Sequence, residues 1–197
     1  MLKYRRTVIR ENLRRAFPDH TASDIEALAQ ANEAYFCDLL LETFRLFSWT
    51  QRDLSRHIQF HGWDIQNPAL SSGKNIILAY GHLGNWEWVS AKYAIDSPFQ
   101  FFGVYHPLSN PFFDELMYSM RRRWSMRLIR MRGALRKIRR LLKVDASDRK
   151  PFALALIADQ SAPPTGSYWT RFLNQETAFF QGIEKMGRVY DLPVVYL

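Results

Sequence analysis

"NIILAYGHLGNWEW" (Asn75–Trp88) joins two local patterns that decide the fold. Its first half, from Ile76 to Tyr80, is a continuous apolar run of the length expected for a strand buried on both faces. In its second half Asn85, a good N-cap residue, stands directly before the helical start "WEW". The stretch therefore predicts a buried strand that passes through a glycine-containing turn into a helix.

The same alternation continues along the chain. Further short apolar runs lie at 99–105, 126–131, 152–158 and 192–197. Helical patterns separate these runs, at about 85–95, 110–123, 133–144 and 178–189. Alternating strands and helices predict a layered α/β/α domain with a largely parallel sheet. Helical spacing over residues 3–17, and in a long segment that begins at the capping residue Thr21, predicts two N-terminal helices in front of it.

Length and composition favour a single globular domain. The 197 residues suffice for one core, which we expect to form one domain over 1–197, with a helical extension at about 1–60 and an α/β part at about 70–197. The chain ends directly after the apolar run "LPVVYL", so we expect a fragment that is incomplete at its C-terminus. Cys37 is the single cysteine, which excludes an internal disulfide, and no apolar run approaches the roughly 18 residues of a membrane span.

Positive charge is concentrated in one segment. The net charge is +8, and residues 121–143 contain nine Arg and two Lys but no acidic residue. The rest of the chain therefore has 27 − 11 = 16 basic residues against 19 acidic residues, a balance of −3. This local excess predicts an anionic partner for 121–143.

His82 directly follows the first predicted strand, at the edge of the sheet where reacting groups gather in α/β proteins. Glu87 falls five residues later, in the first turn of the next helix. We expect its carboxylate to accept the Nδ1–H of His82, which would leave Nε2 as a general base. Capping chemistry around Asn85 and a purely structural histidine would produce the same pattern, so the spacing alone leaves both interpretations open.

Other catalytic signatures are missing from the sequence. It contains no G-x-S-x-G nucleophile elbow and no phosphate-binding G-x-x-x-x-G-K-[ST] loop. His57 and His61 are four residues apart but lack the intervening Glu of a zinc protease. We therefore expect neither a metal nor a bound cofactor.

With these residues in view, "GHLGNWEW" resembles the His-x-x-x-x-Asp/Glu signature of the lysophospholipid acyltransferase superfamily, in the form typical of the lipid A biosynthesis (late) acyltransferases. The resemblance covers most of the chain. It extends to "YRRTVIRENLRRAFPD", which is similar to the segment after the family's N-terminal membrane anchor, and to "GVYHPLSNPFFDELM" and "ALIADQ…FLNQETAFFQGIEKMGRVYDLPVVY".

The resemblance implies an O-acyltransferase at the cytoplasmic face of the bacterial inner membrane, peripheral or anchored by a segment outside this chain. It would move a fatty acyl group from an acyl carrier protein or coenzyme A thioester to a lipid hydroxyl, without a covalent enzyme intermediate. His82 would be the general base and Glu87 its orienting partner. The substrate-binding candidates are Gly84, Asn85, His106, Arg123, Asp159 and Gln160. Backbone amides near Gly84 and Asn85, or a nearby arginine, are the candidates for oxyanion stabilisation.

Two departures from the family pattern leave the acceptor open. The family often has Arg where His106 stands, and an acidic residue where Ser161 follows "DQ". Lipid A precursors, glycerolipids and aminolipids therefore all remain possible acceptors.

The basic segment 121–143 suits an anionic membrane surface, lipid phosphates or an acidic carrier protein. Nucleic acid is a weaker alternative, because Trp124 is the only aromatic residue in the segment that could stack on bases. A solvated helix face would need no partner at all. Two alternative functions follow: an acyl thioesterase, in which water replaces the lipid hydroxyl, and a non-catalytic binder of anionic membranes or nucleic acid.

Overall fold

A five-stranded parallel sheet is the largest sheet of the computed structural model, which describes residues 5–144, 150–160 and 162–197. Its strands are β1 (Ile76–Tyr80), β2 (Gln100–Tyr105), β3 (Arg127–Arg130), β4 (Phe152–Ile157) and β7 (Val194–Tyr196), in the order β3-β2-β4-β1-β7. Every neighbouring pair is parallel. All five apolar runs identified in the sequence are therefore strands, and the predicted α/β class is confirmed.

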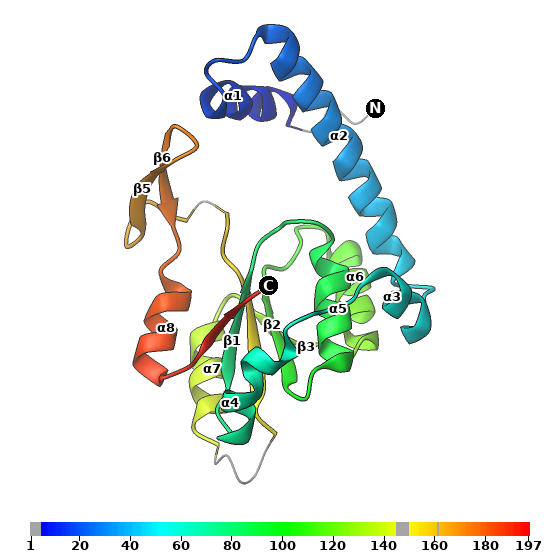
Figure 1. Cartoon of the computed structure of the whole chain (residues 1–197), viewed down its shortest axis with the longest axis vertical. Helices are drawn as coiled ribbons and strands as arrows, with labels where there is room; N and C mark the ends of the chain where they lie inside the picture. The colour runs from blue at the N-terminus through cyan, green and yellow to red at the C-terminus, as the bar shows by residue number, and fades with distance from the viewer. Residues whose placement is uncertain (1–4, 145–149, 161) are drawn as a thin grey trace. The chain divides into compact units, whose positions relative to one another are not determined.

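Helices cover both faces of this sheet (Figure 1). On one face α5 (Trp86–Asp96), α6 (Pro111–Arg123) and the short α3 (Gln51–His57) pack on a core that includes Ile76 and Phe101. On the other face α7 (Ala134–Leu142) and α8 (Gly182–Tyr190) pack around a second core, which includes Ile138. Layers on both faces explain why β1 and β4 are apolar throughout rather than alternating.

Two short helices lie between α3 and β1. A 3₁₀ turn, η1 (Trp63–Gln66), leads into α4 (Asn67–Ser71) just before β1.

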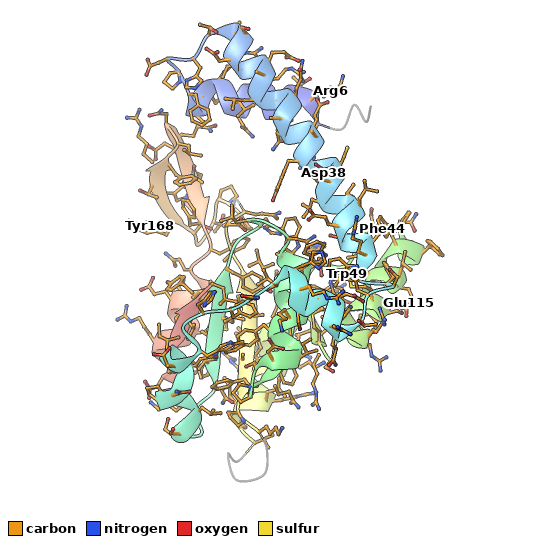
Figure 2. The ribbon with its side chains drawn as sticks, turned by 45° about the vertical axis from the view of Figure 1, so that its right-hand side comes forward. Arg6, Asp38, Phe44, Trp49, Glu115 and Tyr168 are labelled. Atoms are coloured by element: carbon orange, nitrogen blue, oxygen red, sulfur yellow. The ribbon has the colours of Figure 1, made fainter. Side chains whose placement is uncertain are left out.

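Trp49, labelled in Figure 2, lies before α3. Its ring stacks on His57 at 4.4 Å and meets Trp88 of α5 at 4.5 Å between centroids. The aromatic packing ties α3 to α5. It also places the His57 ring between Trp49 and Trp88.

The chain divides into two compact units, and the sheet belongs to the second, Arg45–Asp159 with Gln181–Leu197. The first unit combines Met1–Phe44 with Gln160–Phe180. It contains α1 (Arg6–Ala16), α2 (Ala22–Arg45) and an antiparallel hairpin of β5 (Tyr168–Phe172) and β6 (Gln175–Phe179). The two predicted N-terminal helices are thus present, with a capping box of Thr21 and Asp24 at the start of α2.

The hairpin corrects one sequence prediction. The helical pattern at 178–189 placed the last helix over residues that β6 occupies, and α8 begins only at Gly182. The two residues of the hairpin turn, Leu173 and Asn174, both have positive φ, 49° and 58°. A leucine rarely adopts this conformation, so the sequence lacks the Asn-Gly type of signal by which such a turn is recognised.

Candidate active site

The topology brings the ends of β1 and β4 together. The two strands are neighbours in the sheet, and their register pairs Tyr80 with Ile157. His82 lies two residues beyond Tyr80, and Asp159 lies two residues beyond Ile157. Because parallel strands end at the same edge, His82 and Asp159 leave the sheet at the same level and face each other.

The carboxylate of Asp159 binds His82 twice. Its Oδ1 lies 2.7 Å from Nδ1 of the ring, and its Oδ2 accepts a hydrogen bond of 2.7 Å from the backbone N–H of His82. A carboxylate can only accept, so Nδ1 carries the proton and the lone pair of the neutral ring is on Nε2. Within the described residues Nε2 makes no hydrogen bond, and the His82 side chain is 30% exposed. The ring is thus fixed, with its basic nitrogen open to a reactant.

The acidity of Asp159 follows from the same contacts. Burial by itself would raise the pKa of Asp159, but the hydrogen bonds from the backbone and the ring of His82 outweigh burial and hold the pKa below its usual value. The group is therefore ionised at neutral pH and can stabilise a positive charge on the imidazole.

Two neighbours of His82 complete this geometry. Gly81 leaves room for the carboxylate, because a Cβ at that position would lie 3.0 Å from Oδ2 of Asp159. Trp86 places its ring edge-on to the imidazole, with centroids 4.6 Å apart. The glycine before the histidine is thus explained by the close approach of Asp159, and the tryptophan restrains the ring from the side.

Glu87 has a different partner from the one that the spacing predicted. Its carboxylate accepts two hydrogen bonds from Arg121 of α6, at 3.0 Å from Nε and 2.6 Å from Nη2, and the residue is only 6% exposed. The expected contact with Nδ1 of His82 is therefore corrected: Asp159 occupies that nitrogen. The reason is that the first turn of α5 faces α6 on the same side of the sheet, where Arg121 requires a counter-charge.

Arg121, which the sequence analysis did not single out, connects Glu87 to the end of β2. Its guanidinium lies over the Tyr105 ring, 5.6 Å from the centroid, and the Tyr105 hydroxyl accepts a hydrogen bond from Nε of Arg130. Nearby, the hydroxyl groups of Tyr80 and Ser90 are 2.6 Å apart. These contacts form a polar layer that holds α5, α6 and the sheet together behind the histidine.

The other predicted site residues have varied positions. Asn85 is the N-cap of α5, as predicted, and its side chain accepts from the backbone N–H of Trp88 at 3.2 Å. Gly84 has a φ of 58°, a conformation that favours glycine, so the turn after His82 requires it. His106 is exposed at the end of β2, and its Nδ1 donates to the Pro107 carbonyl.

Arg123 is engaged structurally. Its guanidinium donates to the carbonyls of Leu46 and Trp49 at 2.6 and 2.7 Å. Gln160 belongs to the first unit, so its predicted part in the site stays a prediction. Ser161, the other departure from the family pattern, lies outside the described residues.

A histidine and a carboxylate at the carboxyl ends of adjacent parallel strands, with one imidazole nitrogen open, form an arrangement that is suited to acid–base chemistry. Residues 1–196 match the bacterial lipid A biosynthesis acyltransferases, and the chain belongs to this family of the lysophospholipid acyltransferase superfamily. The family makes it an acyltransferase of the lipid A type. No curated protein matches the chain. Among the described residues, no helix is both long and apolar enough to cross a membrane.

Proposed function

We propose that this protein transfers a fatty acyl group from a thioester, on acyl carrier protein or coenzyme A, to a hydroxyl group of a lipid acceptor at a membrane surface. The observation that carries the proposal is the double contact of Asp159 with the ring and the backbone of His82, which leaves Nε2 open. The site's own residues supply the acid–base chemistry, and we propose that neither a metal nor a bound cofactor takes part.

His82 acts first as a base. Nε2 takes the proton of the acceptor hydroxyl while the hydroxyl oxygen attacks the thioester carbonyl, so a carbon–oxygen bond forms and the carbonyl oxygen gains the negative charge. The imidazolium that results is stabilised by the ionised carboxylate of Asp159. When the tetrahedral intermediate collapses, the carbon–sulfur bond breaks and Nε2 returns the proton to the leaving sulfur. No bond forms between the enzyme and the acyl group.

Glu87 has a positioning role in this proposal. Its ion pair with Arg121 fixes the first turn of α5 and therefore the loop of residues 82–85. Backbone N–H groups of that loop, near Gly84 and Asn85, are the candidates for stabilising the oxyanion. Holding the loop still is what such stabilisation requires, because the donors must be in place before the charge develops.

The test compares His82→Ala with the unmodified protein, using a labelled acyl thioester, a lipid acceptor and mass spectrometry of the products. We expect the variant to lose acyl transfer by at least about 10²-fold, the lower range for general acid–base catalysis. Its circular dichroism should remain that of the folded protein. Full activity in the variant would remove His82 from the mechanism, and release of free fatty acid alone by the unmodified protein would show a thioesterase instead.

A further inference from the structure

The β5–β6 hairpin of the first unit exposes a cluster of large apolar side chains. It consists of four of the six residues from 168 to 173: Tyr168 (labelled in Figure 2), Trp169, Phe172 and Leu173. Each of them is 48–59% exposed. We call these four side chains the hairpin patch. A continuous exposed apolar patch on a folded unit is typical of a surface that binds a partner.

The turn of the hairpin holds its apolar side chain at a cost in backbone strain. Leu173 and Asn174 have φ values of 49° and 58°, and two-residue turns with positive φ favour Asn-Gly, because bulky side chains rarely adopt this conformation. Leu173 recovers little of the cost by packing within the protein, since half of its surface is exposed. Strain that is kept at an exposed position indicates a function for the side chain.

The hairpin patch changes in character along β5. Phe172 and Leu173, at the turn, have side chains of hydrocarbon only, whereas Tyr168 and Trp169, at the other end of the strand, each have a polar group. Nε1 of Trp169 donates to the Pro164 carbonyl at 3.2 Å. The same order is found across a bilayer interface, where Trp and Tyr lie at the level of the headgroups and purely apolar side chains lie deeper. An interface with another protein would not require this order.

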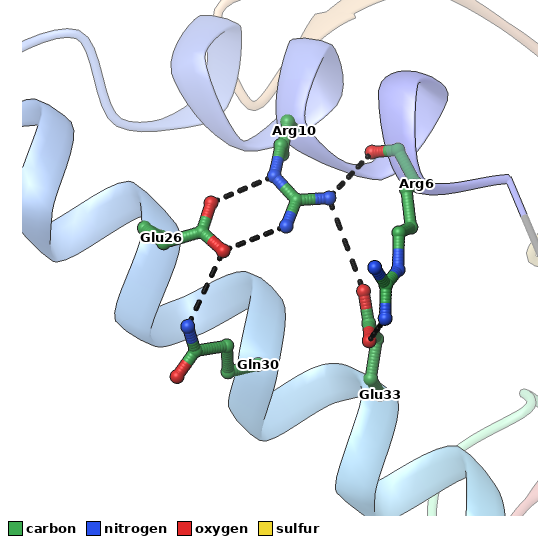
Figure 3. Close-up of polar contacts among 5 residues, drawn as sticks. All are labelled: Arg6, Arg10, Glu26, Gln30 and Glu33. Carbon is green, nitrogen blue, oxygen red and sulfur yellow. Dashed lines mark hydrogen bonds and ion pairs between the residues drawn. The ribbon is translucent and has the colours of Figure 1, made fainter. Parts of the chain in front are cut away.

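Helix α1, which belongs to the same unit, has four arginines, and two of them are neutralised by α2 (Figure 3). Arg10 binds Glu26 through two hydrogen bonds of 2.7 Å, and Arg6 binds Glu33 at 2.8 Å. These ion pairs fix α1 on α2. The arginine charge that remains for a partner therefore lies in the last turn of α1.

Arg14 and Arg15 supply that charge, and both are exposed. In the part of the chain that the structure describes, neither forms an ion pair. The side-chain amide of Asn174 donates to the Ala16 carbonyl at 3.2 Å, so the hairpin turn lies at this end of α1. Each cation close to an anionic bilayer raises the affinity about fivefold. The charge thus complements an anionic lipid surface at the place where the apolar tip would enter it.

We propose that the hairpin patch inserts into the interface of an anionic lipid bilayer, with Arg14 and Arg15 on the lipid phosphates. This inference goes beyond the proposed function, because it gives the first unit a lipid-binding surface whose binding requires no acyl transfer. The two residues at the tip extend about 7 Å at roughly 3.4 Å per residue, which matches the 5–10 Å to which interfacial segments are buried.

The experiment uses Leu173→Gly in the full chain and cosedimentation with vesicles of phosphatidylglycerol and phosphatidylethanolamine. We expect the affinity for the vesicles to fall about tenfold, because one leucine side chain no longer enters the lipid. The melting temperature should stay the same or rise, since glycine adopts positive φ without strain. A leucine with a merely structural role would instead lower the melting temperature when it is removed.

Ile65→Gly is the matched control. It removes a side chain of the same composition from an exposed position of η1 in the second unit, and it should leave vesicle binding unaltered. Arg14→Gln/Arg15→Gln tests the charge. This variant should bind the anionic vesicles more weakly, with less dependence on salt, and should bind phosphatidylcholine vesicles as the unmodified protein does.

Three results would overturn the inference. They are unchanged vesicle binding by Leu173→Gly, an equal loss of binding by Ile65→Gly, and a dimer in solution that Leu173→Gly dissociates while no form binds vesicles. The last result would assign the hairpin patch to a second copy of the chain. The vesicle assay contains no thioester, so vesicle binding by a protein that transfers no acyl group would refute the proposed function alone.

Discussion

Replacing Asp159 with Asn tests which carboxylate orients His82. In the structure the two oxygens of Asp159 accept two different N–H groups, one from the ring and one from the backbone of His82. An amide of the same shape has a single acceptor oxygen, so one of these N–H groups would face an NH₂ group instead. The ring would then lose its fixed tautomer or the loop would lose its anchor, and the imidazolium would lose its counter-charge.

The size of the effect follows from this loss. General acid–base catalysis by a positioned side chain contributes about 10²–10⁴ to the rate, and we expect Asp159→Asn to lose most of that factor. Its stability should change little, because the Asp159 side chain is 44% exposed and exposed ion pairs contribute about 0–1 kcal/mol. The variant should therefore combine a large fall in kcat with a nearly unchanged melting temperature.

The matched comparison is Glu87→Gln, since both substitutions convert one carboxylate to an amide. Single-turnover acyl transfer, measured with saturating lipid acceptor, gives the chemical rate of each variant, and thermal unfolding gives its stability. We expect the Asp159 variant to lose the greater part of the rate and the Glu87 variant the greater part of the stability. The reverse ranking, with Asp159→Asn active and Glu87→Gln inactive but fully stable, would refute the assignment and restore the pairing that the sequence spacing predicted.

Three further predictions concern other contacts. Arg121→Met removes one partner of a buried ion pair and leaves Glu87 without a counter-charge, so unfolding by urea should show a loss of about 3–5 kcal/mol, and Arg121→Met/Glu87→Leu should recover part of it. Gly81→Ala brings a Cβ to 3.0 Å from Oδ2 of Asp159, so acyl transfer should fall while the far-ultraviolet circular dichroism stays unchanged; normal activity would contradict the close approach. Hydrogen bonds from Arg10 lower the pKa of Glu26 from 4.5 to about 2. The contribution of Glu26 to the stability of the first unit is therefore present above pH 4.5 and is lost as the pH falls toward 2. In pH-dependent thermal melts, Glu26→Gln should remove this part of the acid sensitivity.

The sheet was predictable because its strands carry a strong signal of their own. Each of the five lies in a short apolar run, and the interior strands β1 and β4 are mostly buried. Such runs stand out whatever their neighbours are. The hairpin of β5 and β6 has no such signal. Half of its ten strand residues are exposed. Its turn relies on Leu173 and Asn174 at positive φ, a conformation that a leucine does not indicate in the sequence. The helix predicted at 178–189 consequently started too early.

The place of His82 in the fold was predictable, but the carboxylate that contacts it was not. The position of His82 after a buried strand follows from the local sequence, and so does the capping role of Asn85. The partner of the histidine depends on strand order, because Asp159 reaches it only if β4 lies directly beside β1. Sequence separation favours Glu87, five residues away, over Asp159, which is 77 residues away. Glu87 instead lies in the first turn of α5 and binds Arg121.

The different contacts of the two carboxylates, Asp159 with His82 and Glu87 with Arg121, have a physical reason. A group that orients the base must stay ionised, reach the ring and tolerate a change of charge on it during the reaction, which suits a partly exposed side chain at a strand end. A group that fixes a helix against its neighbour is best buried in a bidentate ion pair, where separation of the charges is costly. Glu87 meets the second requirement and Asp159 the first. Both carboxylates hold the loop of residues 82–85. We therefore expect a substitution of Asp159 to affect the ring of His82, and a substitution of Glu87 to affect the backbone of His82.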